Sequence, residues 1–85
     1  MSNYVYLLVS TNKKKPISYV GYTKNLKKRV NLHNNSKGAK FTKGRFWELA
    51  YFKRFLTKSD ALKEEYKLKK NYTLRSKIKK KFLKK

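Results

Sequence analysis

The sequence has few of the residues that cross-link or stiffen small proteins: no cysteine, one proline and three glycines among 85 residues. Without cysteine, neither a disulfide framework nor a thiolate zinc site can stabilise the fold, which is typical of a reducing compartment. A chain of this length buries about 60–65% of the surface that its unfolded form exposes. We therefore expect one small domain over residues 1–85, stabilised by a hydrophobic core.

Acidic residues are also scarce. Four Asp and Glu stand against 25 Lys and Arg, which gives a formal net charge of +21. This excess favours a polyanionic partner, because nucleic acid releases counterions when basic side chains bind it. Hydrophobic residues make up 39% of the chain, which separates it from a disordered basic tail. Nucleic acid is the expected partner, although a ribosome-associated or membrane-surface protein would satisfy the charge as well.

Long apolar runs are absent too. The first ten residues, MSNYVYLLVS, have neither the basic start of a signal peptide nor an apolar run long enough to span a membrane. We expect a soluble cytoplasmic protein with no membrane partner, and association with the nucleoid is left open. The high charge disfavours tight self-association, so we expect a monomer.

Two stretches near the N-terminus predict a hairpin. Residues 4–10, YVYLLVS, are nearly continuous β-formers, which is typical of a strand covered on both faces. Residues 17–23, ISYVGYT, follow a polar loop at 11–16 and return as an antiparallel partner. Gly21 lies inside this second strand, where a glycine marks a bulge or a group that approaches the backbone.

Three helices are expected. They span 26–34, 60–70 and the basic C-terminal segment 72–85, with Asn25 capping the first and Thr57, Ser59 or Asp60 capping the second. A basic loop at 38–45 and a third strand at 46–55 separate the first two helices. The order β-β-α-β-α-α predicts the α/β (α+β) class, as a small three-stranded antiparallel sheet flanked by helices.

The first helix carries two polar residues beside its apolar stripe. At about 100° per residue, Leu26 and Val30 define the stripe, and Arg29 and His33 lie on its flank. The arginine either covers apolar surface with its stem or binds a phosphate. A histidine at this place is typical of a C-terminal cap or a partner of the helix dipole.

The second helix brings a carboxylate toward the core. With Ala61, Leu62 and Leu68 as the buried face, Glu65 lies near its centre and Glu64 at its edge. A buried carboxylate is unfavourable unless it is paired or binds a metal, so an ion pair and a metal site both fit. The scarcity of acidic residues favours a functional site.

The strand tyrosines have two interpretations. Tyr4, Tyr6 and Leu8 share one strand face, and Tyr19 and Gly21 share a face of the next strand. Most strand tyrosines are core residues or cross-strand partners. The pattern predicts Tyr6 and Tyr19 as cross-strand neighbours beside the gap that the glycine leaves.

An ordered set of motifs resembles the GIY-YIG nuclease domain. It consists of YVY at 4–6, YVG at 19–21, an arginine eight residues after that glycine, and a helix glutamate. The segment SYVGYTKNLKKRVNLHN is similar to the N-terminal nuclease domain of the excinuclease C subunit. The segment 36–70 is similar to small stand-alone bacterial GIY-YIG proteins and to Slx-type endonucleases. The resemblance covers roughly 3–70 and implies the same three-stranded fold.

The resemblance implies a DNA endonuclease that uses one Mg²⁺ or Mn²⁺ ion, is structure-selective or weakly sequence-specific, and acts in DNA repair or recombination. By position in the family pattern, the resemblance implies metal binding for Glu65 and catalytic roles for Tyr6, Tyr19, Gly21, Arg29 and His33. One tyrosine would orient or deprotonate water, and the arginine would stabilise charge on the phosphate. The glycine would leave space beside Tyr19 for phosphate, metal and water.

The expected nucleic-acid contacts are Lys24, Lys28, Lys37, Lys40, Lys43 and Arg45. Branched or nicked DNA is the expected substrate, and RNA is left open. The alternative is a non-catalytic nucleic-acid-binding protein on the same fold.

Overall fold

A computed structural model describes residues 2–11 and 15–84. Three strands, β1 (Asn3–Ser10), β2 (Ile17–Thr23) and β3 (Glu48–Phe55), form an antiparallel sheet in the order β2-β1-β3. The predicted hairpin and third strand are confirmed. Part of the predicted polar loop, residues 12–14, lies outside the described residues, as does the last residue of the predicted C-terminal segment.

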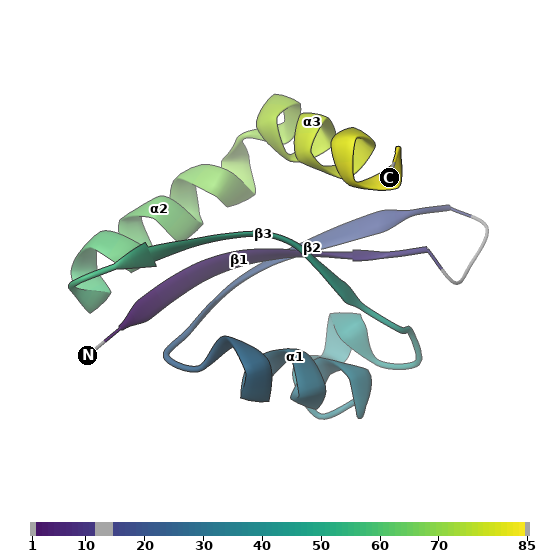
Figure 1. The fold of residues 1–85 in the computed structure, drawn as a ribbon, viewed down its shortest axis with the longest axis horizontal. Coiled ribbons are helices and arrows are strands. Elements are labelled where there is room, and N and C mark those ends of the chain that lie inside the picture. The colour runs from purple at the N-terminus through teal and green to yellow at the C-terminus, as the bar shows by residue number, and fades with distance from the viewer. Residues whose placement is uncertain (1, 12–14, 85) are drawn as a thin grey trace.

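The helices cover both faces of the sheet (Figure 1). They are α1 (Leu26–Asn34), α2 (Lys58–Lys70) and α3 (Tyr72–Leu83), and a short 3₁₀ helix, η1 (Lys40–Thr42), lies within the predicted basic loop. One face carries α1 and η1, and the other carries α2 and α3. The predicted order β-β-α-β-α-α is therefore confirmed, with three layers around a central sheet.

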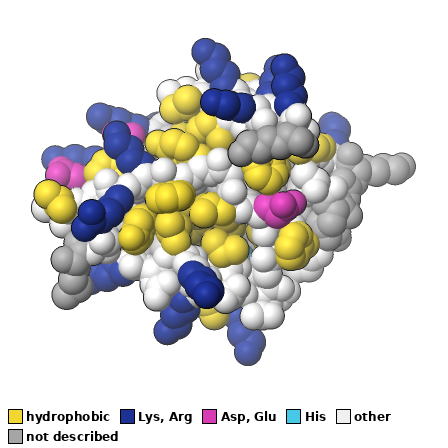
Figure 2. Space-filling model, viewed as in Figure 1, with side chains coloured by type: hydrophobic (Ala, Val, Ile, Leu, Met, Phe, Trp, Pro, Cys, Tyr) yellow, Lys and Arg dark blue, Asp and Glu magenta, His cyan; other side chains and the backbone are white. Residues whose placement is uncertain are grey.

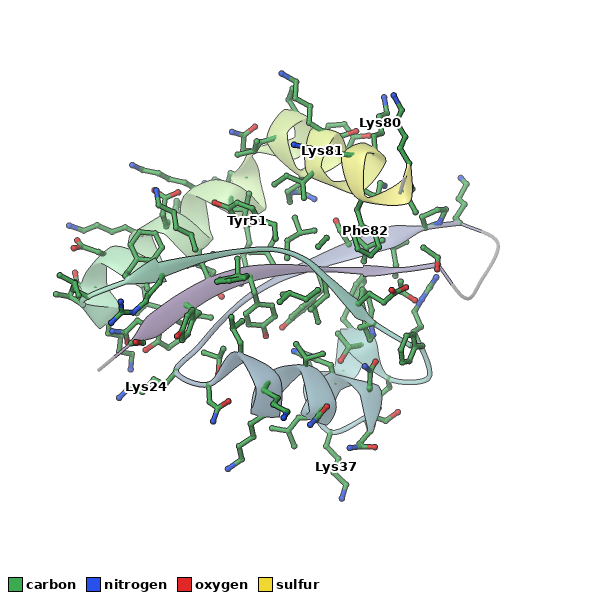
Figure 3. The ribbon with its side chains drawn as sticks, viewed as in Figure 1. Lys24, Lys37, Tyr51, Lys80, Lys81 and Phe82 are labelled. Carbon is green, nitrogen blue, oxygen red and sulfur yellow. The ribbon has the colours of Figure 1, made fainter. Side chains whose placement is uncertain are left out.

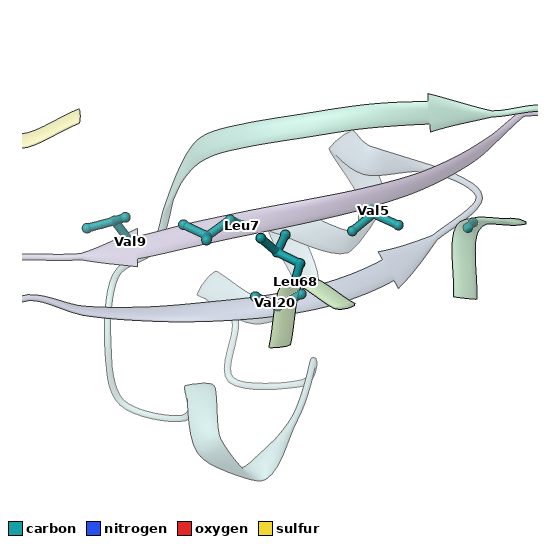
Figure 4. Close-up of a cluster of buried hydrophobic side chains, with 6 residues drawn as sticks. Val5, Leu7, Val9, Val20 and Leu68 are labelled. Atoms are coloured by element: carbon teal, nitrogen blue, oxygen red, sulfur yellow. The ribbon is translucent and has the colours of Figure 1, made fainter. Parts of the chain in front are cut away.

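The central strand β1 anchors the core on both faces. Every residue of β1 except Tyr4 is buried, as its continuous run of β-formers predicts. One face packs Val5, Leu7 and Val9 against Leu68 of α2 (Figure 4). Burying each such side chain contributes about 1.5–3 kcal/mol.

The opposite face of β1 is aromatic. Tyr6 and Leu8 pack there with Trp47, and Leu26 and Val30 of α1 are half-buried against them. Because the sheet separates this cluster from the α2 side, the two faces can serve different purposes.

The predicted helix caps explain where α1 and α2 begin. The Asn25 side chain accepts from the backbone N–H of Lys28 at 3.1 Å, which confirms that cap. Of the three residues proposed for α2, Thr57 is the cap and accepts from the N–H of Asp60 at 3.1 Å. Such caps contribute about 1 kcal/mol each. As a result α2 begins at Lys58, earlier than predicted.

The third strand begins at Glu48, later than predicted. The backbone N–H of Trp47 donates to Oδ1 of Asn34, and Nδ2 of Asn34 donates to the carbonyl of Trp47 at 3.0 Å. Because one amide side chain binds both backbone groups of Trp47, strand pairing starts only at the next residue.

The predicted buried face of α2 is wrong in one respect. Leu62 is 40% exposed, whereas Ala61 and Leu68 are buried. Ala61 and Leu68 are seven residues apart and lie almost in line along the helix, and Glu64 and Glu65 flank that line on opposite sides. Glu65 is therefore not at the centre of the buried face, and the two carboxylates point to different edges of the sheet.

The C-terminal helix packs back on the fold. Ile78 and Phe82 contact the core cluster on the α2 side. Figure 3 shows Phe82 directed from α3 toward the sheet. None of the helices in the described ranges has the length and apolar content that crossing a membrane requires.

Candidate active site

The hydroxyl of Tyr6 lies at the centre of a buried polar network. It is 2.8 Å from Nε2 of His33, and Nε of Arg29 donates to it at 3.4 Å. Both the tyrosine and the histidine are fully buried. Strand β1 supplies the tyrosine, and successive turns of α1 supply the other two, so the hairpin and the first helix together build the network.

The other side of His33 fixes its tautomer. Its Nδ1 lies 2.9 Å from Oγ1 of Thr42, and the proton of that hydroxyl is donated to the carbonyl of Ala39 at 3.0 Å. Since the threonine has no further proton, Nδ1 must carry one and donate it. In the neutral ring Nε2 is then the acceptor, so the Tyr6 hydroxyl donates to it.

Burial keeps this histidine neutral. It lowers the pKa of His33 below the ordinary value, and the positive charge of Arg29 lowers it further. The predicted roles of His33 as a helix cap or dipole partner are therefore wrong. The backbone N–H of Asn35 instead satisfies carbonyls at the end of α1, and the imidazole has partners for both nitrogens in the core.

Burial also raises the pKa of Tyr6, so the phenol stays protonated at neutral pH. The hydrogen bond and charge of Arg29 oppose this shift, whereas Tyr19 and the negative charge of Glu65 add to it. Desolvation is the largest of these influences on the pKa of Tyr6, and the charge of Glu65 is the smallest.

Two glycines make room for the rings of the network. Gly21 lies opposite Tyr6 in the β1–β2 register, and a Cβ at that position would lie inside contact distance of the Tyr6 phenol oxygen. A Cβ at Gly38 would overlap the ring of His33 in the same way. The prediction that the gap at Gly21 admits phosphate, metal and water is therefore wrong, because the ring of Tyr6 fills it.

Tyr19 lies at the border between this network and solvent. It is half-buried, and its ring centroid is 5.1 Å from that of His33 in an edge contact. Its other neighbour is the exposed ring of Phe41, stacked at 6.0 Å. In the sheet register Tyr19 faces Leu8, so it is a diagonal rather than a direct neighbour of Tyr6.

Arg29 points inward along the network. Its Nε binds the Tyr6 hydroxyl, and an Nη donates to the carbonyl of Gly38 at 3.2 Å. The guanidinium is held by two oxygens instead of extending freely into water. This arrangement fixes a cation beside the phenol of Tyr6.

Glu65 is the carboxylate that the family resemblance assigns to metal binding. Its side chain is 19% exposed and pairs with Lys69 at 3.5 Å, one turn further along α2. Within the described residues, no three His, Asp or Glu side chains cluster as a ready metal site. A single carboxylate fits a hard ion such as Mg²⁺, which retains several waters and takes further ligands from substrate phosphate.

The predicted nucleic-acid contacts divide into two groups. Exposed side chains belong to Lys24, Lys28, Lys37, Lys40 and Lys43. Lys24 and Lys37 extend from the fold near opposite ends of α1 (Figure 3). Arg45 differs, because its guanidinium donates to Oγ of Ser10 at 3.2 Å and to the carbonyl of Lys15 at 3.1 Å. It therefore has a structural role between the loop and the hairpin.

Lysine and arginine dominate the surface more widely. On the face in Figure 2, basic side chains lie mostly toward the rim, around a central group of hydrophobic side chains. This distribution agrees with the formal charge of +21.

Sequence reasoning missed Thr42, Gly38 and Asn34. The first orients His33, the second makes room for its ring, and the third holds Trp47. Gly38 was a usable signal, since it is one of only three glycines in the chain. No sequence pattern indicated that a loop threonine would bind a helix histidine.

Comparison with known proteins adds independent information. The sequence model of the family described as the GIY-YIG catalytic domain matches residues 2–80 of this chain. A UPF0213 protein of Oceanobacillus iheyensis is 44% identical over 68 residues, which cover 79% of this chain and 76% of the relative. A UPF0213 protein of Staphylococcus epidermidis is 52% identical over 62 residues, covering 72% and 74%. The solution NMR structure of a UPF0213 protein from Bacillus halodurans is 36% identical, covers 81% of this chain and 71% of that chain, and has a TM-score of 0.46.

Proposed function

The chain belongs to the GIY-YIG family, whose members are generally endonucleases that use divalent metal ions, and we propose that it is itself a metal-dependent DNA endonuclease. The observation that carries this proposal is the buried network that fixes the guanidinium of Arg29 beside one phenol. Tyr6 of β1 accepts from Arg29 of α1, and the same hydroxyl lies 2.8 Å from Nε2 of His33.

Tyr19 is the tyrosine that we assign to the attacking water. Tyr6 is fully buried and firmly protonated, so it cannot meet a water from solvent. Tyr19 is half-buried at the edge of the same network. As the water oxygen bonds to phosphorus, its proton passes through the Tyr19 hydroxyl to solvent. The bond from phosphorus to the leaving oxygen breaks, and that oxygen takes a proton from solvent.

Tyr6 and His33 act as positioning residues. The network from Arg29 through Tyr6 and His33 to Thr42 has one consistent direction of hydrogen bonding. It therefore holds the guanidinium in one place before substrate arrives. A cation fixed in this way stabilises the charge that develops on the phosphate in the transition state.

Glu65 would hold a Mg²⁺ or Mn²⁺ ion, which when bound polarises a phosphate oxygen and stabilises the leaving group. The ammonium of Lys69, which is 53% exposed, pairs with this carboxylate, and ion pairs with an exposed partner contribute little stability. A divalent ion can therefore displace the ammonium. The substrate class we propose is branched or nicked DNA with weak sequence preference, as in repair or recombination.

The test is incubation of the purified protein with nicked, flapped and branched DNA, with and without Mg²⁺ or Mn²⁺. We expect metal-dependent cutting that Glu65→Ala abolishes while DNA binding is retained.

A non-catalytic nucleic-acid-binding protein is the second candidate. It is favoured by the pairing of Glu65 with Lys69, which leaves the carboxylate already neutralised. Tight, salt-sensitive binding without cutting under either metal would establish this second function and exclude the first.

A further inference from the structure

We propose that a pocket beside the active site binds one nucleotide of the substrate strand, with its phosphate on Lys69 and Arg75 and its base against Phe41. This inference rests on the proposed nuclease function and adds the C-terminal helix α3 to the nucleic-acid interface. None of these three residues was among the contacts that the sequence predicted.

The pocket lies where four elements of the fold meet. It has a volume of about 290 Å³ and is lined by Ser18, Tyr19, Val20, Phe41, Lys69 and Arg75. These residues come from β2, η1, the end of α2 and the start of α3. Because β2 is an edge strand, no further strand of residues 2–11 and 15–84 covers this side of the sheet. The volume is near the lower end of the range for small-molecule sites, which suits a single nucleotide.

One wall of the pocket is aromatic. Phe41 is 58% exposed although its ring stacks on Tyr19, with centroids 6.0 Å apart and planes 22° apart. An exposed ring that is stacked on one side offers a flat, preorganised surface to a nucleobase. Base–aromatic stacking is the usual way in which proteins bind unpaired bases without sequence preference.

The other wall is cationic. The Nε of Arg75 donates to the carbonyl of Leu68 at 3.1 Å, which holds the side chain over the joint between α2 and α3. None of the hydrogen bonds among the described residues uses its terminal nitrogens. These nitrogens form the planar fork that binds phosphate oxygens in pairs.

Lys69 links the pocket to the metal carboxylate. Its ammonium pairs with Glu65 at 3.5 Å, and its side chain is 53% exposed. When a divalent ion takes the carboxylate, the ammonium is released at the pocket. Charge neutralisation at Glu65 and phosphate binding at Lys69 therefore favour each other, and Tyr19 lines the same pocket as Lys69.

The first measurement is binding of a short fluorescein-labelled single-stranded oligonucleotide of mixed sequence, in chelator, over a series of salt concentrations. We expect Arg75→Gln to weaken binding severalfold and to reduce the salt slope by about 0.7, the value for one phosphate contact on a single strand. Glutamine can still donate to the Leu68 carbonyl, so the helix joint is kept.

The matched control is Arg54→Gln on β3, at the opposite edge of the sheet, where Nε of Arg54 donates to Oγ of Ser2 at 2.7 Å. It removes the same charge, and glutamine can likewise still donate to the hydroxyl of Ser2. Equal loss of affinity and salt slope in the two variants would overturn the proposal, because it would show that only net charge matters.

The second pair of variants tests the aromatic wall without changing charge. Phe41→Leu should weaken binding of the same oligonucleotide by about fivefold or more. Phe46→Leu removes a ring of similar exposure, 55%, that does not line the pocket, and should leave affinity unchanged. Equal affinities of these two variants would also overturn the proposal.

The fluorescence of Trp47, the only tryptophan, provides a local readout because its ring centroid lies 6.3 Å from that of Phe41. It should change on oligonucleotide binding by the wild type. A cleavage assay run beside these titrations separates the two proposals. If the pocket variants weaken binding but the protein does not cut DNA, the nucleotide pocket is supported and the nuclease function is excluded. If the protein cuts DNA but the pocket variants bind like their controls, the nuclease function is supported and the nucleotide pocket is excluded.

Discussion

Tyr6 and Gly21 face each other across β1 and β2, and the phenol of Tyr6 lies over the glycine where any other residue would place its Cβ. Gly21, from the motif at 19–21, thus leaves the space that the ring of Tyr6, from the motif at 4–6, occupies. Their relationship sets the position of the hydroxyl that Arg29 and His33 bind.

Gly21→Ala should therefore displace the Tyr6 ring and break its bonds to Arg29 and His33. We expect a loss of about 1–3 kcal/mol in the free energy of unfolding, the usual effect of overpacking a core. Urea denaturation measures this loss. Cleavage should fall further than stability explains, since the arginine loses its acceptor.

Gly44→Ala is the control for this substitution. Gly44 has a φ of +76°, but a Cβ there meets no atom within 4 Å. Backbone strain should lower the free energy of unfolding by about 1–2 kcal/mol without moving Tyr6. If Gly21→Ala has the same free energy of unfolding and the same cleavage rate as the wild type, the contact between Gly21 and Tyr6 contributes to neither stability nor cleavage.

Thr42→Val tests the orientation of His33. The substitution keeps the shape of the side chain but removes the oxygen that accepts from Nδ1. A buried N–H without a partner lowers stability by about 1–3 kcal/mol. Thr42→Ser restores the oxygen and should recover most of the stability and of any cleavage rate. Failure of serine to recover either would show that only the methyl group of the threonine matters.

The pH dependence of stability follows from the lowered pKa of His33. Between the folded value and the ordinary value of about 6.5, the unfolded state binds more protons than the folded state. The stabilisation by this neutral histidine is therefore complete above about pH 6.5 and is lost as the pH falls toward the folded pKa. Urea midpoints measured from about pH 7 down to 5 should decrease.

NMR provides the direct check, because His33 is the only histidine in the chain. Its ring signals should titrate below the ordinary value and show the proton on Nδ1 at neutral pH. A midpoint at or above the ordinary value would contradict the buried, neutral network.

Local signals in the sequence were sufficient for most of the fold. The run of β-formers at 4–10 predicted a strand covered on both faces, and β1 is central. Asn25 predicted the start of α1, and Thr57 was one of three candidates for the cap of α2, because an N-cap acts within one turn of its own residue. Such features depend on neighbours in sequence and need no knowledge of tertiary contacts.

The polar core could not be predicted in the same way. Whether a histidine is buried depends on partners for both nitrogens, and His33 finds them in β1 and in η1. The sequence places Glu65 at the centre of the buried face of α2 because Leu62 is apolar and is expected to be buried, whereas it is exposed. Residue type alone could not show which side of that helix meets the sheet.

The most direct test of the account is single-turnover cleavage of flapped DNA in Mg²⁺ by the wild type and by Tyr19→Phe. The account predicts metal-dependent cutting by the wild type and a loss of about 10²–10⁴ in rate for the variant, the usual contribution of a proton-transfer group, with DNA binding unchanged. Absence of cutting by the wild type, or equal rates for the two proteins, would contradict it.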